Sequence, residues 1–406
     1  MNTDTARRED PRTPGHLLVL GSGPQAEWEA ALKRLAEVGP LVLINDTPAT
    51  WQRPYVAATR VANALRPEHV EQAARWLAIK HTITAVLHFH PSHLRAAAAV
   101  RASLGLPGPT AGVLATTSLR HRTLEVLDHA GTPSSGGIHA DSFDQALQAA
   151  HTVGFPLVCK PAAPRRRYAA RIVDSAAELA EAFSAATAAS WPGAGTVIEP
   201  RLDGIEATAY TLDARLVAIS HATFDPEAEP SLMPLEVVVD ADDVCAATIE
   251  STVAGALEAT GHRQGIAQIR LRITHTGPRV LSLTTHLTDP LVATLIEQVT
   301  GIDLIAASGR HARGLPTEAD ATPLGAAAIR YVQGAAASRL SSISATRSTI
   351  TPYARLDRYN ADSRTGPLPR RGHLLVTGTD FPQCITRLRN AVAQMQTLST
   401  TCDRAG

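Results

Sequence analysis

The stretch VGFPLVCKPA, residues 153–162, contains an apolar run that ends at Lys160. The run predicts a buried strand, and a strand that ends in Lys-Pro before a short loop and a second strand often holds a nucleotide. Loops of that kind are usually rich in glycine, because backbone N–H groups must approach phosphates. The loop here has no glycine and carries Arg165, Arg166 and Arg167 in a row. We therefore expect it to bind an anion through side-chain charge rather than through its backbone.

Apolar runs and helix-like segments alternate upstream of this stretch. The run HLLVL is followed by a Gly-Ser-Gly turn and by a helix pattern, and one more such pair and a third apolar run follow before residue 90. Alternation of this kind predicts a parallel α/β sheet. The proline- and glycine-rich residues 104–112 predict the end of this domain. The polar residues 1–15 predict a disordered tail, which leaves an N-terminal α/β domain over residues 16–112.

The remaining chain predicts a central domain and a C-terminal region. We expect helices over residues 116–131, 175–190 and 290–301, a strand–bend–strand over 195–212, and a β-hairpin over 265–287 with its turn at 275–278. Short strands and turns from about residue 325 lead to a last helix over 383–398. The expected domains are thus a central one over 113–324, with a lid at about 133–198, and a C-terminal α+β subdomain over 325–406.

Composition excludes several classes of function. Charge is balanced, with 38 basic and 38 acidic residues, so contact with a nucleic acid would need a local basic patch. Aromatic residues make up only 4% of the chain, which argues against a broad base-stacking platform. The four cysteines are far apart and form no metal-type pair, and no stretch is long and apolar enough to span a membrane. We expect a cytoplasmic protein with no membrane partner.

The order of these segments resembles the ATP-grasp superfamily, and within it the carboxylate–amine ligases that join free L-amino acids. The resemblance rests on LGLPGP (104–109), VGFPLVCKPA with Lys160, and VIEPRLDGIEATAYTL with Glu199 and Glu206. It continues in GPRVLSL (277–283), in residues 289–304 and in residues 370–388. It implies an ATP-grasp fold in which two lobes hold ATP. It also implies magnesium at the phosphates, an acyl phosphate intermediate and attack by an amine.

The positions that hold magnesium in that family differ in this sequence. The first metal-binding glutamate falls on Arg270, and the Glu-x-Asn-x-Arg pattern after the hairpin turn reads Ser282, Thr284 and His286. Magnesium prefers carboxylate and other hard oxygen ligands, and Arg270 would repel it. The sequence therefore predicts no metal ligand. The sequence argues against magnesium as a cofactor, and ATP remains a candidate cofactor.

Some of the positions that contact the nucleotide in that family carry the expected residue in this sequence. Lys160, Glu199 and Glu206 remain, and the lysine expected earlier in the family pattern is Arg120. We expect these four side chains to contact the cofactor or its phosphates. For Lys160 the simpler alternative is a pair with Glu199, and for Glu199 and Glu206 it is that they are acids flanking a turn.

Several cations and hydroxyls are candidates for binding the donor. The expected set for the substrate or a phosphate backbone is Arg165, Arg166, Arg167, Arg171, Arg272, Ser282 and Thr284. The alternative for the arginine loop is a solvated lid whose charges do little. Arg270 is expected either to hold an anion or oxyanion in place of the metal, or to form a salt bridge with an acid such as Glu206.

Histidines offer a second kind of chemistry. His286, where the family has an arginine, is a candidate general base for an attacking amine, and the alternative is a packed side chain. The spacing of His88, His90 and His93 is not a zinc pattern, so we interpret them as loop histidines near a cleft.

Three functional hypotheses follow. The first is an amide-forming enzyme that attaches an amino acid to the amine of a small molecule from a pre-activated donor such as aminoacyl-tRNA. The second is an ATP-dependent carboxylate–amine ligase with an atypical metal site. The third is a non-catalytic relative that binds a ligand or partner. The sequence leaves a homodimer open and does not identify the amino acid or the amine.

Overall fold

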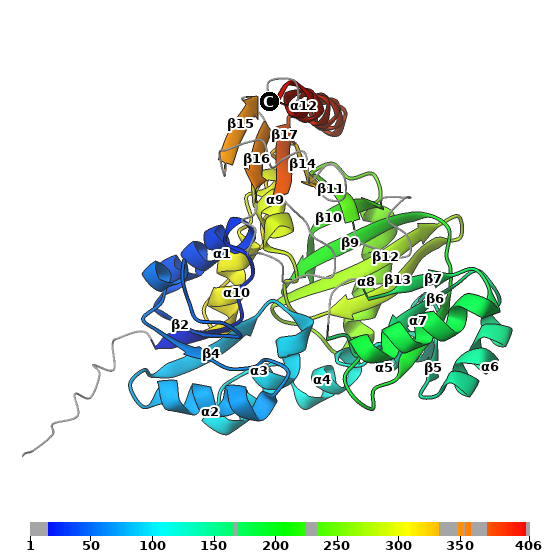
Figure 1. The fold of residues 1–406 in the computed structure, drawn as a ribbon, viewed down its shortest axis with the longest axis horizontal. Helices are drawn as coiled ribbons and strands as arrows, with labels where there is room; N and C mark the ends of the chain where they lie inside the picture. The colour runs from blue at the N-terminus through cyan, green and yellow to red at the C-terminus, as the bar shows by residue number, and fades with distance from the viewer. Residues whose placement is uncertain are drawn as a thin grey trace, which may run out of the picture.

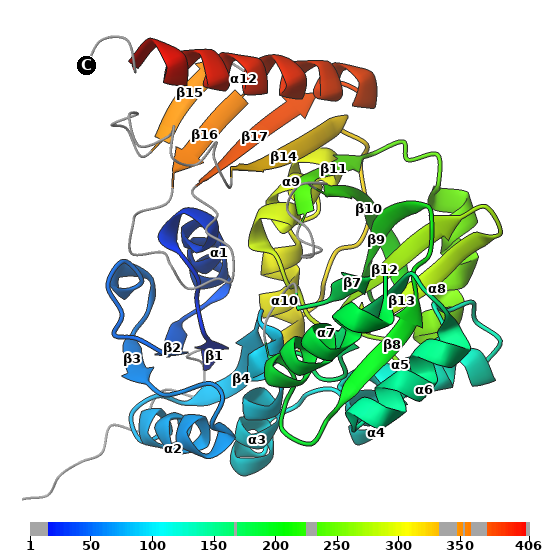
Figure 2. The same cartoon turned by 45° about the vertical axis from the view of Figure 1, so that its right-hand side comes forward.

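The computed structural model describes residues 15–165, 169–224, 234–332, 347–351, 354–358 and 372–402. Three sheets organise these residues, and Figures 1 and 2 show them from two directions. The predicted disordered tail falls almost entirely outside the described residues, and so do Arg166 and Arg167.

A parallel sheet forms the N-terminal part, as predicted. Its strand order is β3-β2-β1-β4. The strands are β1 (His16–Leu20), β2 (Leu41–Asn45), β3 (Ala58–Val61) and β4 (Ile83–His88). Helix α1 (Gln25–Val38) packs on one face, and α2 (Pro67–Ala78) and α3 (Leu94–Leu104) pack on the other. Strand β3 was not predicted, because its four residues are half-buried or exposed and form no apolar run.

A small antiparallel sheet forms the lid, with order β5-β8-β6-β7. Its strands are β5 (Ile138–Ala140), β6 (Leu157–Pro161), β7 (Arg171–Val173) and β8 (Thr196–Pro200). Helices α6 (Phe143–Val153) and α7 (Ala176–Ala189) cover one face through an alanine-rich core. These two helices leave the other face open toward the rest of the molecule (Figure 2), and there Leu124 of α5 (Arg120–His129) packs against Ala162 and Val197.

The helix predicted over residues 116–131 is two helices, which corrects the prediction. They are α4 (Ala111–Thr117) and α5 (Arg120–His129). Leu119 between them has an extended backbone, with φ −122° and ψ 122°, and the N–H of Arg120 donates to the carbonyl of Ala162, 2.8 Å away. This bond ties the start of α5 to the lid strand that carries Lys160, so tertiary contact overrides local helix propensity.

A nine-stranded antiparallel sheet holds the rest of the chain, with order β13-β12-β9-β10-β11-β14-β17-β16-β15. Its central strands are β9 (Ile205–Leu212), β10 (Arg215–Phe224), β11 (Pro234–Asp240), β12 (Ile266–Thr274) and β13 (Gly277–Thr284). The later strands are β14 (Ala326–Val332), β15 (Arg347–Thr351), β16 (Ala354–Arg358) and β17 (Gly372–Gly378). The predicted hairpin is confirmed as β12 and β13. The expected boundary at residue 325 falls inside this continuous sheet.

Helices cover both faces of the large sheet. Helix α8 (Ala246–Thr260) packs under β9, β10, β12 and β13, and α12 (Phe381–Cys402) packs across β14 to β17 on the same face. Helices α9 (Pro290–Thr300) and α10 (Leu304–Ala312) pack on the opposite face and reach the N-terminal sheet. One hydrophobic core therefore runs from α1 through α9 and α10 to β14.

Polar contacts reinforce this junction. Arg34 of α1 pairs with Glu297 of α9 at 2.5 Å, and Arg313 donates to the carbonyl of Pro40 at 2.9 Å. Within the described residues, no single helix is both long and apolar enough to cross a membrane. Helices α9 and α10 meet that test only as a pair, with a bend of 109° between them.

Candidate functional site

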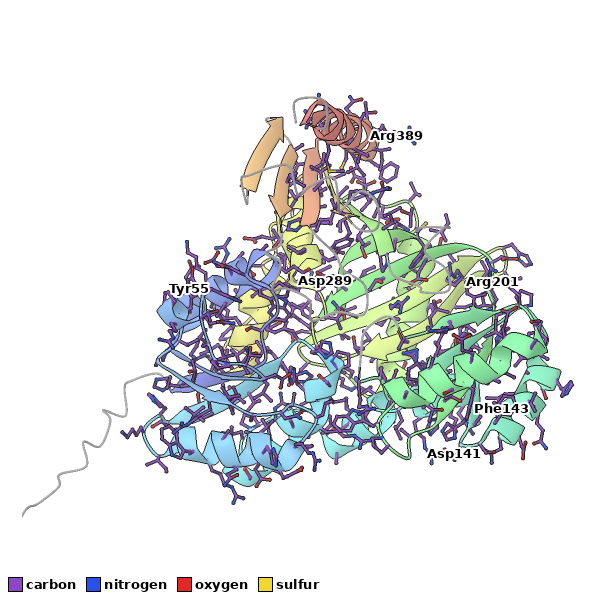
Figure 3. All side chains as sticks on the ribbon, viewed as in Figure 1. Tyr55, Asp141, Phe143, Arg201, Asp289 and Arg389 are labelled. Carbon is purple, nitrogen blue, oxygen red and sulfur yellow. The ribbon has the colours of Figure 1, made fainter. Side chains whose placement is uncertain are left out.

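A cavity of about 560 Å³ lies where the three sheets meet. The open face of the lid, strands β9 to β13 and the start of α3 contribute to its walls. Asp289, at the start of α9, lies near the centre of the molecule, and Arg201 lies farther out, at the lid side (Figure 3). The ionisable lining residues are Arg95, Arg120, Lys160, Glu199, Arg201, Asp203, Glu206, Arg270, Arg272, His286 and Asp289.

Lys160 and Glu199 form a buried ion pair in the wall of the lid. Side chains alternate along β6, so Leu157 and Cys159 enter the lid core while Val158 and Lys160 face the cavity. Lys160 Nζ lies 2.5 Å from Glu199 Oε2, and the two side chains are 8% and 1% exposed. Burial lowers the pKa of Lys160, and the charge of Glu199 opposes that effect. The pairing that the sequence offered as the simpler alternative is present, while a role in phosphate contact stays a prediction.

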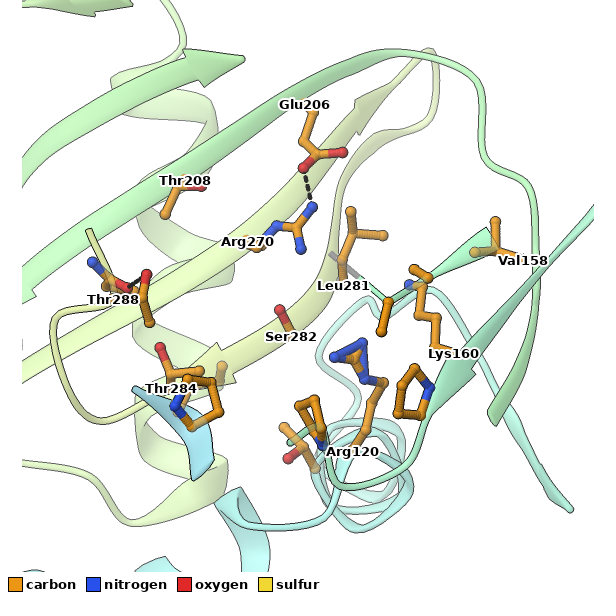
Figure 4. Close-up of a pocket in the computed structure, with 18 of the residues that line it drawn as sticks. Arg120, Val158, Lys160, Glu206, Thr208, Arg270, Leu281, Ser282, Thr284 and Thr288 are labelled. Atoms are coloured by element: carbon orange, nitrogen blue, oxygen red, sulfur yellow. Dashed lines mark hydrogen bonds and ion pairs between the residues drawn. The ribbon is translucent and has the colours of Figure 1, made fainter. Parts of the chain in front are cut away.

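Glu206 is held by two arginines of the neighbouring strand. Arg270 and Arg272 lie on one face of β12, and each donates to a different oxygen of the Glu206 carboxylate, Arg272 at 3.0 Å. Figure 4 shows the contact of Arg270 with Glu206. Burial acts to raise the pKa of Glu206, but the charges of the arginines outweigh it, so the pKa lies below its usual value. The salt bridge proposed as one alternative for Arg270 is therefore present.

Arg120 brings an additional cation to the same space. Its guanidinium makes no hydrogen bond or ion pair with the described residues, and its Nε is buried. Burial lowers its pKa, Glu199 acts to raise it, and Arg270 lowers it further. Arg120 and Lys160 project toward the Arg270–Glu206 pair from the other side of the cavity (Figure 4). An anion entering here would meet a guanidinium that makes no hydrogen bond with the described residues.

Ser282, Thr284 and His286 line the cavity, and the substrate contact expected for the two hydroxyls stays a prediction. Ser282 is paired with Arg270 in the sheet, and both hydroxyl side chains are half-buried. His286 is buried, and its ring centroid lies 4.5 Å from that of His88. Its place in the wall suits either of the two roles considered for it, so the general-base role stays a prediction.

The arginine-rich loop is placed differently from the expectation. Arg165 donates to the carbonyl of Ala188 at 2.6 Å, Arg171 pairs with Glu181 at 2.8 Å, and neither lines the cavity. Both are bound to the lid's own helix α7, which corrects their expected part in a clamp at the cavity. Arg166 and Arg167, the other two members, lie outside the described residues.

Several lining residues were not predicted from the sequence. Thr288 donates to Gln268 at 2.7 Å, and Tyr331 donates to Asp289 at 3.1 Å. The Gln268 amide nitrogen is buried and has no hydrogen-bond partner among the described residues. These residues lie on β12, on β14 and in the loop before α9, so no local motif joins them. Only the alternation of β12, which places Gln268 on the same face as Arg270, could have indicated one of them.

The acidic side chains of the cavity, except Asp203, already form ion pairs or hydrogen bonds with other residues of the protein. Glu199 pairs with Lys160, and Glu206 with two arginines. Asp289 accepts the N–H groups of Leu291 and Val292 and the hydroxyl of Tyr331. Asp203 is exposed. Within the described part of the chain, the one set of side chains spaced to hold a metal ion is His221, Asp243 and Cys245, which do not line the cavity.

Comparison with known proteins agrees with the fold. Residues 120–207 match the family model "Carbamoyl-phosphate synthase L chain, ATP binding domain". This match begins at Arg120 and ends just past Glu206, and so contains Lys160 and Glu199. No curated protein sequence matches the chain.

Solved structures match over nearly the whole length. An L-amino acid ligase from Bacillus licheniformis has a TM-score of 0.74 at 16% identity, covering 94% of this chain and 98% of its own. The N5-carboxyaminoimidazole synthetase from Staphylococcus aureus, complexed with ADP, has a TM-score of 0.70 at 11% identity, with coverages of 94% and 97%. A biotin carboxylase from Campylobacter jejuni has a TM-score of 0.68 at 16% identity, with coverages of 93% and 91%. The chain therefore has the ATP-grasp fold.

Proposed function

We propose that this protein forms amide bonds on its ATP-grasp fold, attaching an amino acid to the amine of a small molecule. In this proposal the amino acid arrives already activated, on an anionic carrier such as tRNA. The observation that carries it is the Glu206 carboxylate held by Arg270 and Arg272. A carboxylate neutralised by two guanidinium groups is a poor ligand for magnesium, and the adjacent hydroxyls of Ser282 and Thr284 are weak ones.

The cationic groups of the cavity fit the same proposal. Arg120 and Lys160 face the Arg270–Glu206 pair, and Arg120 has no partner among the described residues. A phosphate or the ribose-phosphate end of a carrier would satisfy that guanidinium. The partners we propose are thus an amino-acid donor, with aminoacyl-tRNA as the first candidate, and a small-molecule amine acceptor.

The proposed reaction is a simple acyl transfer. The acceptor nitrogen attacks the ester carbonyl, the new C–N bond forms, and the C–O bond to the carrier breaks. His286 would take the proton from the amine, and the departing hydroxyl of the carrier would receive it. Arg270 would stabilise the oxyanion that forms between the two steps. The acyl group is already activated in this scheme, so it consumes no ATP.

The first test is calorimetric titration of the protein with ATP, with and without magnesium, at moderate salt. We expect any binding to be indifferent to magnesium. The second is transfer of radiolabelled amino acids from a charged tRNA pool to small amines, followed by chromatography. Tight ATP binding that magnesium strengthens, together with ADP release, would overturn the proposal.

A pair of variants connects the cavity to binding. Arg270→Met removes one cation from Glu206, and we expect it to weaken binding of the anionic donor at least about tenfold, as is usual for a charged contact. Arg330→Met is the matched control, because Arg330 forms a comparable 2.6 Å pair with Glu236 and does not line the cavity. Equal losses in both variants would mean that the effect is not local to the cavity.

An ATP-dependent carboxylate–amine ligase is the second candidate. The match of residues 120–207 to a family of ATP-binding domains and the intact Lys160–Glu199 pair favour it. In that case the charge of Arg270 would replace part of the charge of a metal at the phosphates. Release of ADP that depends on both an amino acid and an amine would select this candidate over the first.

A further inference from the structure

A cluster of metal-type ligands lies on the side of the large sheet away from the cavity. His221 of β10, and Asp243 and Cys245 before α8, each offer one ligand atom, and these atoms all lie within 4.8 Å of one another. His221 Nε2 lies 2.5 Å from Asp243 Oδ2. The Cys245 N–H donates to Asp243 Oδ1 at 2.8 Å, so the turn holds the carboxylate in place.

Strand alternation separates this cluster from the proposed active site. Ser220 and Ala222 line the cavity, so His221 between them points to the opposite face, toward α8. Neither Asp243 nor Cys245 lines the cavity. A function of this cluster therefore does not depend on the function proposed above.

The contacts among the three side chains argue against a role for Cys245 as a nucleophile. In a cysteine nucleophile the histidine contacts the thiol and the acid orients the histidine. Here Asp243 contacts both His221 and Cys245 and stands between them. Burial and the neighbouring Asp243 raise the pKa of the Cys245 thiol, which opposes formation of a free thiolate. The arrangement lacks the base that a nucleophile needs.

We propose that His221, Asp243 and Cys245 bind a Zn²⁺ ion that fastens β10 to the start of α8. Imidazole nitrogen, carboxylate oxygen and thiolate sulfur are the ligands that zinc uses in proteins. Binding releases the thiol proton, so one thiolate and one carboxylate together balance the two charges of the ion. Three protein ligands leave a fourth position for water.

The distances between the three ligand atoms fit a tetrahedral zinc site after a small adjustment of the side chains. Tetrahedral zinc places its ligand atoms about 3.4–3.6 Å apart, as follows from metal–ligand distances of about 2.0–2.3 Å. The present atoms fall within 4.8 Å, and the 2.5 Å contact between His221 and Asp243 would open by about 1 Å as the ion replaces the shared proton.

Neighbouring groups favour a cation at this position. Asp240 and Asp242 lie in the same turn, where the Asp242 N–H donates to Asp240 at 3.3 Å. Burial raises the pKa of Asp240, and the charges of Asp243 and Asp242 raise it further. His221 Nε2 is the ring nitrogen that contacts Asp243, so it is the nitrogen that reaches the site.

The test starts with the full-length, tag-free protein stripped by a chelator. Titration with Zn²⁺ against a chromophoric indicator is expected to give one tight site per chain and to raise Tm. Titration with Co²⁺ is expected to give the near-ultraviolet absorption band of a thiolate–metal bond. Wild-type protein that shows neither a stoichiometric site nor this band would overturn the proposal, whatever the variants do.

Matched variants assign the ligands. Cys245→Ser is expected to remove the thiolate band and to weaken Zn²⁺ binding at least about tenfold, since even loss of an outer-shell partner has that effect. Cys159→Ser is the control, because Cys159 is buried in β6 of a different sheet, and it should keep both properties. His221→Gln should weaken binding without removing the band. A band that persists in Cys245→Ser, or that Cys159→Ser removes, would assign the metal elsewhere and refute this site.

Discussion

At the scale of single residues, His93 shows how burial sets the charge of a side chain. It lies at the end of the 3-10 helix η2 (Pro91–His93), is 9% exposed, and packs against Gly21. A Cβ at Gly21 would lie 2.2 Å from the His93 ring, so only glycine fits beside it. Burial lowers the pKa of His93 to about 4, although Asp46 acts to raise it. The folded protein therefore keeps this imidazole neutral well below the pH at which a free histidine takes a proton.

The first prediction concerns stability between pH 7 and pH 4. The folded pKa of His93 is below that of the unfolded chain, about 6.5. The unfolded state therefore binds the extra proton, and the free energy of unfolding falls as the pH drops through this window. His93 alone contributes a loss of about 3 kcal/mol, from a shift of roughly 2.5 units at 1.36 kcal/mol each.

Urea unfolding at several pH values measures this loss. His93→Gln should be less stable at pH 7 but should lose less stability on acidification than the wild type. His151→Gln, which replaces an exposed histidine, should leave the pH dependence unchanged. Parallel curves for the wild type and His93→Gln would show that His93 does not titrate in this window. Burial also lowers the pKa of His88 well below its usual value. His88 therefore also lowers the free energy of unfolding as the pH drops, and it is present in both the wild type and His93→Gln.

Sequence reasoning at this scale named the correct partners, as the simpler alternatives, where the partners lie on strands of one sheet. The pairs Lys160–Glu199 and Arg270–Glu206 were both considered, and both are present. It failed for Arg165, which lies on a loop. A loop has no period, and the carbonyl of Ala188 that Arg165 meets belongs to a helix end that only the fold brings near.

At the scale of elements, the turn between β8 and β9 sets the position of Glu206. Gly204 has φ +133°, and a Cβ there would lie 2.1 Å from the carbonyl oxygen of Ile273 on β12. The Gly204 carbonyl also accepts a hydrogen bond from Arg272 at 3.1 Å. The close approach of two backbones at this point brings Glu206 opposite Arg272 in the sheet.

The second prediction is that Gly204→Ala both destabilises the protein and weakens ligand binding. The alanine bears backbone strain of about 1–3 kcal/mol and must also displace Ile273. Gly277→Ala is the matched control in the adjacent hairpin, because Gly277 has φ +110° but no atom within 4 Å of the added Cβ. Chemical unfolding should show Gly204→Ala to be the costlier change by at least about 1 kcal/mol. Equal costs would mean that the contact with Ile273 relaxes freely.

Prediction of elements from the sequence depended on the strength of their patterns. The hairpin of β12 and β13 and the helix α9 were predicted because each has a clear period and an end signal, such as Gly301 after α9. The split between α4 and α5 was not predicted. The break at Leu119 comes from a hydrogen bond to Ala162, 43 residues away along the chain, and no local signal reports such a bond.

At the scale of the whole molecule, strand pairing joins parts that look separate in the sequence. Strand β11 pairs with β14, so the C-terminal strands extend the central sheet although 85 residues separate the two strands' ends. The order of segments indicated the fold through its resemblance to a known family. It did not indicate this continuity, because pairing between distant antiparallel strands leaves no periodic trace in the sequence.

A contact across the cavity joins the N-terminal part to the lid. The guanidinium carbon of Arg95, on α3, lies 4.7 Å from the centre of the Trp191 ring, which follows α7 in the lid. Trp191 is 8% exposed, and its backbone N–H donates to the carbonyl of Ala163 at 2.9 Å. Both residues line the cavity, so this cation–π contact closes part of its wall.

The third prediction is that Arg95→Ala loosens the lid while leaving the fold intact. A cation–π contact of this kind is worth about 0.5–2 kcal/mol, which is small beside the buried core that joins α1, α9 and α10. The chain has four tryptophans, so fluorotryptophan labelling gives four resonances in a fluorine spectrum. The Trp191 resonance should shift and become more sensitive to exchange of the solvent from H₂O to D₂O, and Tm should change little.

Arg60→Ala is the matched control for this change. Arg60 stacks on Trp76 with its guanidinium carbon 3.0 Å from the ring centre, and both residues belong to the N-terminal part. This variant should move the Trp76 resonance and leave that of Trp191 in place. If Arg95→Ala also leaves the Trp191 resonance unchanged, the lid is held by the apolar contacts of Trp191 with Ala163 and Ala194 alone. If the resonance responds as expected, a charge on the N-terminal part controls access to the cavity, and ligand association should then be faster in Arg95→Ala than in the wild type.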